Sequence, residues 1–192
     1  MNGVSFDGEA IWAAADERLL AVSPSSGELQ RAIEVRAQAG TAFDGRHLYQ
    51  LADGAIQKLD RDSGRVLSRI PAPPGDLSGM AWAEGYLWIG EYQAGKIHQV
   101  DPESGAVVRT LESNRFVTGV TWVQGELWHG TIDAAQSELR QIDPQTGHAV
   151  RRLAMPQGAL VSGLESNGDD LFYCGGAASG KIRAVRRSRR RT

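Results

Sequence analysis

The sequence has only one cysteine, Cys174, among its 192 residues. No disulfide can therefore form within the chain, and a reducing compartment suits it. It also has no run of eighteen apolar residues, and Met1 is followed by neither a basic stretch nor an apolar run. Without a membrane-spanning segment or an export signal, we expect a cytoplasmic protein with no membrane partner.

Motifs of several enzyme classes are missing as well. The sequence contains no Gly-x-Ser-x-Gly elbow, no His-Glu-x-x-His, no P-loop, and no Gly-x-Gly-x-x-Gly in a suitable context. These absences argue against hydrolase, zincin and nucleotide-binding folds.

Charge is unevenly distributed. The formal net charge is −2, yet the last twelve positions hold seven basic residues and no acidic one. Removing these seven charges leaves about −9 on residues 1–180. Basic tails attract phosphates, but chain ends usually fray. We therefore expect residues 188–192 to be a solvated tail with no specific nucleic-acid partner.

Glycine and aromatic residues recur at regular intervals. One pattern, a glycine followed by two aromatic or apolar anchors, occurs five times. The copies begin at Gly3, Gly40, Gly79, Gly119 and Gly163. A turn glycine lies between the two halves of each copy, at Gly8, Gly45, Gly85, Gly125 and Gly168. Each copy predicts a β-hairpin of fixed register.

A second half-unit follows each hairpin. Alternating strands at 19–22, 56–59, 97–100 and 139–142 run into turns such as Asp101-Pro-Glu-Ser-Gly105, and a fourth strand leads out. Proline, Asp or Ser, and glycine each favour such a turn. In the fifth copy the strand at 181–185 meets arginines instead of this turn, so that copy should have three strands.

Repeats of about 40 residues with four short antiparallel strands are typical of propellers. We predict an all-β protein, a five-bladed β-propeller over residues 1–187. The blades should span about 3–39, 40–78, 79–118, 119–162 and 163–187, with the repeated aromatics packed between them. A β-sandwich is the competing architecture, but it does not explain five copies of one register.

One rim of this propeller can be identified, because the start of the first strand and the end of the second lie at the same mouth. The residues before the starting glycines are Asn2, Ala39, Ser78, Thr118 and Ser162. The residues after the second strands include Asp16, Gln50, Asp53, Glu91, Tyr92, His129, Thr131, Asp133, Tyr173 and Cys174. Such a polar ring predicts a small-ligand or cation site. We interpret Cys174 as a packed hydrophobe rather than a nucleophile.

The fourth repeat, Phe116-Val-Thr-Gly-Val-Thr-Trp-Val-Gln-Gly-Glu-Leu-Trp-His-Gly-Thr131, resembles the glutamine cyclotransferases, the plant-type glutaminyl cyclases. These acyltransferases cyclise N-terminal glutamine to pyroglutamate with loss of ammonia. Their pattern is a Phe-Thr-Gln-Gly-Leu entry followed by Leu-Tyr-Glu-Ser-Thr. The resemblance places their glutamine at Thr118, their acid/base glutamate at His129, and their threonine at Thr131.

Three hypotheses follow for the mouth. In the first, His129 is the catalytic acid/base of a cyclotransferase. Substrate would then contact Thr118, Thr131, Trp88, Glu91, Tyr92, Trp128 and Tyr173, and no cofactor is needed. In the second, the propeller binds a small molecule or peptide without catalysis. In the third, it is a lactonase or lyase whose divalent cation is held by Asp16, Asp53, Glu91 and Asp133. We expect a monomer or weak dimer.

Overall fold

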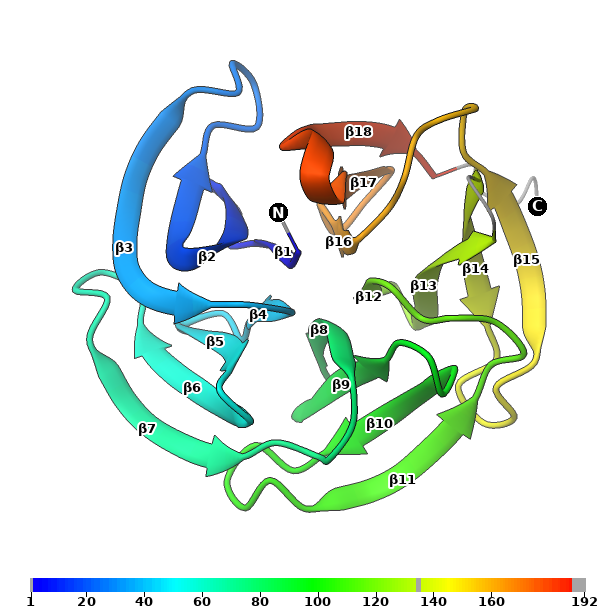
Figure 1. Ribbon diagram of the computed structural model, residues 1–192, viewed down its shortest axis with the longest axis horizontal. Coiled ribbons are helices and arrows are strands. Elements are labelled where there is room, and N and C mark those ends of the chain that lie inside the picture. The colour runs from blue at the N-terminus through cyan, green and yellow to red at the C-terminus, as the bar shows by residue number, and fades with distance from the viewer. Residues whose placement is uncertain (1, 134–135, 188–192) are drawn as a thin grey trace.

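Five antiparallel β-sheets surround a central axis, with the first blade beside the last (Figure 1). This arrangement is seen in a computed structural model that describes residues 2–133 and 136–187. The prediction of an all-β, five-bladed propeller is confirmed. The expected tail at 188–192 lies outside the described residues.

The strands occupy the five blades in chain order. Blade one holds β1 (Val4–Phe6), β2 (Ile11–Val22) and β3 (Leu29–Ala37). Blade two holds β4 (Thr41–Phe43), β5 (His47–Ala52), β6 (Ala55–Asp60) and β7 (Val66–Pro71). Blade three holds β8 (Leu77–Ala83), β9 (Tyr86–Glu91), β10 (Lys96–Val100) and β11 (Val107–Glu112). Blade four holds β12 (Val120–Val123), β13 (Glu126–Asp133), β14 (Gln136–Ile142) and β15 (Ala149–Ala154). Blade five holds β16 (Gly163–Ser166), β17 (Leu171–Gly175) and β18 (Ile182–Arg186).

A short 3₁₀ turn, η1 (Ala177–Ser179), is the one helical element among the described residues. Within the described ranges, no helix has the length and apolar character needed to cross a membrane.

Blade one differs from the prediction, because it has three strands instead of four. The two expected middle strands are continuous in β2. Its first part pairs with β1 through Val4 and Ala13, and its second part pairs with β3 through Leu19 and Ile33. The chain doubles back at Asp16, which has a φ of 58°.

The turns between the third and fourth strands follow the predicted chemistry. In blade three, the Asp101 carboxylate accepts hydrogen bonds from the Ser104 backbone N–H (2.8 Å) and hydroxyl (2.7 Å). Gly105 has a φ of 75°, and its N–H donates to the Asp101 carbonyl at 2.9 Å. Glycine fits this left-handed position without a steric penalty.

The five starting glycines form a closed ring at the centre. A methyl group on Gly79 would lie 2.5 Å from the Gly119 Cα, and one on Gly119 would lie 2.7 Å from the Gly163 carbonyl carbon. The ring closes where Gly163 meets Gly3 and continues from Gly3 to Gly40. These glycines are required for close backbone approach, since none of them has a positive φ. Closure is therefore completed within one chain.

Aromatic rings fill the layers between blades, as predicted. The second anchor of one blade stacks on the first anchor of the next. Ring centroids are 5.4 Å apart for Tyr49 and Trp82, and 5.3 Å apart for Trp88 and Trp122. In blade five, Ser166 replaces the first aromatic, and Trp128 packs instead on Phe172. Such pairs add stability beyond the area they bury.

Arg187 joins blade five to blade four. Its guanidinium donates to the Glu126 carboxylate at 2.8 Å, to the Gln124 side-chain oxygen at 2.5 Å, and to the Asp169 carbonyl at 3.1 Å. The side chain is only 4% exposed. Arg187 directly precedes the predicted solvated tail, yet its side chain is buried. We call its hydrogen bonds between the two blades the Arg187 clamp.

The glycine ring predicts an unequal response to added methyl groups. Gly79→Ala should lose at least the roughly 1–3 kcal/mol typical of an overpacked core, because backbone atoms cannot move aside easily. Gly85→Ala is the control, since its turn has free space and only its positive φ is strained, at about 1–2 kcal/mol. Urea unfolding measures both. A smaller loss at Gly79 than at Gly85 would contradict the ring.

The Arg187 clamp predicts a loss of stability in Arg187→Ala. Removing charge-assisted hydrogen bonds should cost roughly 1.5–3 kcal/mol. Arg186→Ala is the matched control, because Arg186 is 84% exposed and its nearest carboxylate contact is 3.4 Å long. Thermal unfolding should separate the two variants. Equal midpoints would rule out the clamp.

Candidate functional site

A cavity of about 250 Å³ lies at the centre of the mouth. All five residues that precede the starting glycines line it, namely Asn2, Ala39, Ser78, Thr118 and Ser162. Each of these residues directly precedes a glycine of the closed ring. The repeated register therefore brings this half of the predicted rim together, whereas of the ten predicted residues that follow the second strands only Tyr92 lines the cavity.

Most polar groups of this rim are already hydrogen-bonded. The Asn2 amide donates to the Gln38 carbonyl at 2.9 Å, and the Ser78 hydroxyl donates to the Val117 carbonyl at 2.6 Å. Thr118 differs. It is 4% exposed, and its hydroxyl has no hydrogen-bond partner among the described residues. A buried hydroxyl without a partner is costly, so Thr118 is suited to a polar ligand.

Two other features complete the mouth cavity. Tyr92 lines one wall, and its ring centroid is 5.1 Å from that of Phe116. Asp76 is the one carboxylate residue among the described residues that line the cavity. The sequence analysis missed Asp76 and Gln38, because only the residue directly before each glycine was considered. Extending that list to three residues before each starting glycine would have found both.

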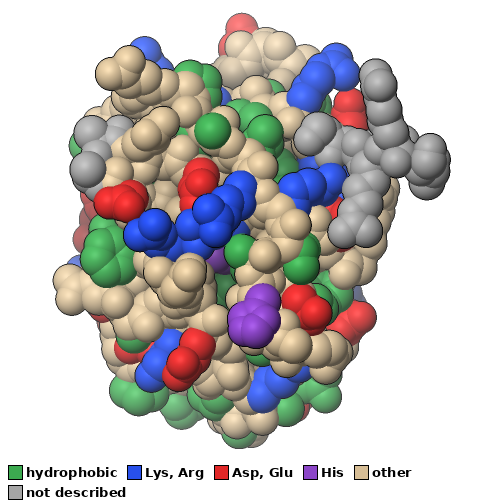
Figure 2. Space-filling view, turned by 90° about the vertical axis from the view of Figure 1, so that its right-hand side faces the viewer, with side chains coloured by type: hydrophobic (Ala, Val, Ile, Leu, Met, Phe, Trp, Pro, Cys, Tyr) green, Lys and Arg blue, Asp and Glu red, His purple; other side chains and the backbone are tan. Residues whose placement is uncertain are grey.

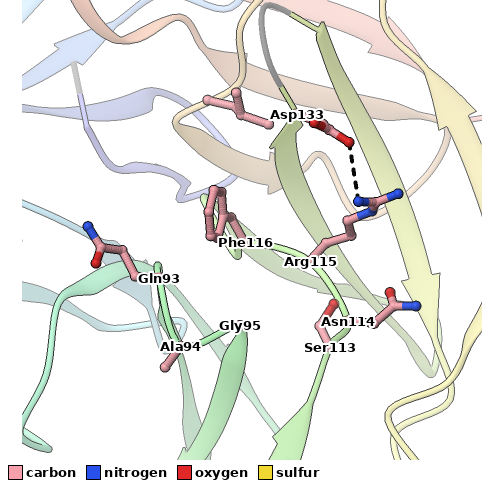
Figure 3. Close-up of a pocket in the computed structure, with 9 residues that line it drawn as sticks. Gln93, Ala94, Gly95, Ser113, Asn114, Arg115, Phe116 and Asp133 are labelled. Atoms are coloured by element: carbon pink, nitrogen blue, oxygen red, sulfur yellow. Dashed lines mark ion pairs between the residues drawn. The ribbon is translucent and has the colours of Figure 1, made fainter.

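A second cavity of about 270 Å³ lies beside the mouth, between blades three and four (Figure 3). Gln93 and Phe116 line it, and Arg115 pairs with Asp133 at 3.2 Å across one side. Ile132 lines both this cavity and the mouth. The two cavities are therefore neighbours that share one wall.

His129 is buried outside both cavities. It is 0% exposed, its Nδ1 donates to the Gly130 carbonyl at 2.9 Å, and its Nε2 lies 3.1 Å from the Ser113 hydroxyl. Burial, with a smaller contribution from the nearby Arg140 guanidinium, lowers its pKa to about 4. His129 is thus neutral near pH 7 and does not reach the mouth, which argues against the predicted acid/base role.

Several predicted substrate contacts are core residues instead. Trp88 and Trp128 lie in the packed layers on the two sides of blade four, and neither lines the mouth. Tyr173 packs against Phe6, with ring centroids 5.3 Å apart. These three assignments are corrected, because strand alternation turns the side chains between blades. Cys174 is also buried there, and burial raises the pKa of its thiol to about 12.

The four acids of the metal hypothesis are not brought together. Asp53 pairs with Arg36 at 3.3 Å, Asp133 pairs with Arg115, and Glu91 lies 3.2 Å from His98 Nε2. Asp16 lies at the turn inside β2. Among residues 2–133 and 136–187, no three His, Cys, Asp or Glu side chains form a group that could hold a metal ion. The predicted ligand set is therefore corrected.

Glu165 is an acid that the sequence analysis did not single out. It lies on the innermost strand β16, where its carboxyl accepts a hydrogen bond from the Thr121 hydroxyl at 2.5 Å. Desolvation by the surrounding protein raises its pKa to about 7. It lines neither the mouth nor the second cavity, so it cannot replace His129 as an acid/base there.

Comparisons with known proteins support the fold. No family model and no curated protein matches the chain. Among solved structures, glutaminyl cyclase from Myxococcus xanthus matches with a TM-score of 0.73 and 15% identity, over 97% of this chain and 91% of that one. A Bacteroides caccae protein of unknown function matches with a TM-score of 0.63 and 14% identity, over 96% and 77%. The predicted resemblance to the glutaminyl cyclase propeller is confirmed at the level of fold.

The burial of His129 predicts a pH-dependent loss of stability. The unfolded residue binds a proton near pH 6.5, whereas the folded residue does so only near pH 4. Stability due to His129 should therefore fall as the pH drops from about 6.5 to 4, by up to about 3 kcal/mol. Urea unfolding of wild type and His129→Gln across this range measures the difference.

Wild type must be compared with His129→Gln because Glu165 changes the pH dependence of stability in the opposite direction. Its raised pKa costs stability as the pH rises from about 4.5 to 7. Subtracting the His129→Gln curve removes this contribution, and His148→Gln, at an exposed position, is the control. A pH-independent difference between wild type and His129→Gln would contradict the buried, neutral histidine.

Proposed function

We propose that the mouth cavity binds a small polar ligand of the amide class, with the N-terminal glutamine of a peptide as the leading candidate. The observation that carries this proposal is the unpartnered Thr118 hydroxyl within a ring of small residues, most of them polar, that line the mouth cavity. A cavity of about 250 Å³ favours a small ligand over a large one. The glutamine class is suggested by the matching fold of a glutaminyl cyclase.

The lining residues suit such a ligand. The Thr118 hydroxyl can donate to an amide oxygen or accept from an amide N–H. The Tyr92 ring provides an apolar wall for the methylene groups. Asp76 supplies a negative charge that would pair with the N-terminal ammonium group.

Cyclotransferase catalysis is a second candidate, favoured by the same fold match. In that reaction the α-amine attacks the side-chain amide carbon, a new C–N bond forms, and ammonia leaves. One proton must move from the attacking nitrogen to the leaving nitrogen. Asp76, rather than His129, would carry that proton, because its carboxylate is at the cavity.

Other properties stay predictions. We still expect a cytoplasmic location, a monomer or weak dimer, and no specific nucleic-acid or membrane partner.

Thr118→Val tests the ligand site. This nearly isosteric change removes only the hydroxyl and should weaken binding of a glutaminyl peptide about tenfold, as expected for one lost hydrogen bond. Thr131→Val is the matched control for a peptide with an amidated C-terminus, because its hydroxyl is equally buried and unpartnered but does not line the mouth. Calorimetric titration measures both. If wild type fails to bind, or both variants bind equally, the proposed site is refuted.

Asp76→Asn tests catalysis separately. If the wild type releases ammonia from glutaminyl peptides, this change should slow release about 10²–10⁴-fold, the usual contribution of a positioned acid/base. His129→Gln should keep most of the rate. Binding without any ammonia release by the wild type would leave the binding function and remove the catalytic one.

A further inference from the structure

A third cavity, of about 370 Å³, lies away from the mouth on blade four. It is formed by β13, β14 and β15 together with Arg115 from the connection between blades three and four. Figure 2 shows this side of the molecule, where basic and acidic side chains lie next to one another. The sequence analysis assigned two of its lining residues, Thr131 and Asp133, to the mouth instead.

Arg140 is the most unusual group in the cavity. It is a buried cation with 2% exposure, and its side chain lines the cavity. Its Nε donates to the Glu138 carboxylate, and its Nη1 donates to the Asn114 side-chain oxygen at 2.8 Å. Among the described residues, Nη2 has no hydrogen-bond acceptor. Nη2 is not one of the fully buried atoms that lack a partner, so it can donate a charge-assisted hydrogen bond to a ligand that enters the cavity.

Thr131 provides a second, independent sign of a missing partner. It is 2% exposed, lines the same cavity, and its hydroxyl has no hydrogen-bond partner among the described residues. Thr131 pairs with Glu138, and His129 pairs with Arg140, in the β13–β14 register. Paired residues lie on the same face of a sheet, so Thr131 and Arg140 face the cavity together.

The charges of the lining favour an anion. Three guanidinium groups, those of Arg115, Arg140 and Arg152, face two carboxylates, those of Asp133 and Glu138. The lining therefore carries one net positive charge. Arg152 is exposed and can approach a ligand from solvent.

We infer that this cavity binds a small oxyanion, either a phosphate or a carboxylate group. Arg140 and Thr131 hold it from the buried side, and Arg152 holds it from the solvent side. Guanidinium groups bind both kinds of oxyanion through paired, charge-assisted hydrogen bonds. The site does not depend on the mouth, because Thr131 and the three arginines are absent from the mouth lining.

The test titrates the full chain with inorganic phosphate and, separately, with acetate, at constant ionic strength set by sodium chloride. Backbone amide shifts followed by NMR should saturate with at least one of the two anions and concentrate on β13 and β14. Saturation with only one anion identifies the preferred group. Absence of saturable shifts with either anion overturns the inference.

Variants make the test specific. Arg152→Gln and Thr131→Val should each weaken the affinity at least about tenfold, since each removes a hydrogen bond to a charged ligand. Arg46→Gln, an exposed arginine in the β4–β5 turn, is the matched control and should bind like wild type. Thermal midpoints verify that each variant is folded. Equal affinities in all variants would mean nonspecific ion binding and overturn the inference.

Discussion

Close contact between five glycines is the constraint on which the rest of this structure depends. Each starting glycine lies against the backbone of the next blade, and Gly163 returns to Gly3, so the ring is closed. A side chain at any of these positions would hold two inner strands apart. The aromatic pairs farther out can stack only because the inner strands approach this closely. Packing between blades is thus set from the centre outward.

The same constraint shapes the mouth. Because the ring fixes where the five inner strands begin, the residues just before the glycines meet around one cavity. Four of those five residues are polar, and the five come one from each blade. A ligand bound there would contact several repeats at once. Ligand binding would therefore depend on the closed propeller, because no single blade provides the whole cavity lining.

The sequence predicted the fold well because the information was repeated. Five copies of one register defined the blades, the ring and the inter-blade aromatics. The site was harder to predict, because it depends on features that differ between copies. Strand alternation turns Trp128 toward blade five and His129 toward blade three, and the Ser113 connection then covers His129. Neither the length nor the path of that connection can be obtained from the repeat.

Blade four keeps the four strands and both aromatic anchors of the repeat, but it places polar residues in its layer toward blade three. On its face toward blade three, the paired residues Leu127 and Ile142 pack into the apolar layer. The next pair on the same face, His129 and Arg140, is polar. Polar residues at core positions are costly unless they have partners. The His129 side chain is satisfied by Ser113 and Gly130. Arg140 and Thr131 keep unfilled hydrogen-bonding capacity. Buried polar atoms without a partner also occur in blades two, three and five, at Gln50, Trp88 and Arg183. The proposed anion site in blade four therefore rests on Arg140 and Thr131 lining one cavity together, and not on their unfilled capacity alone.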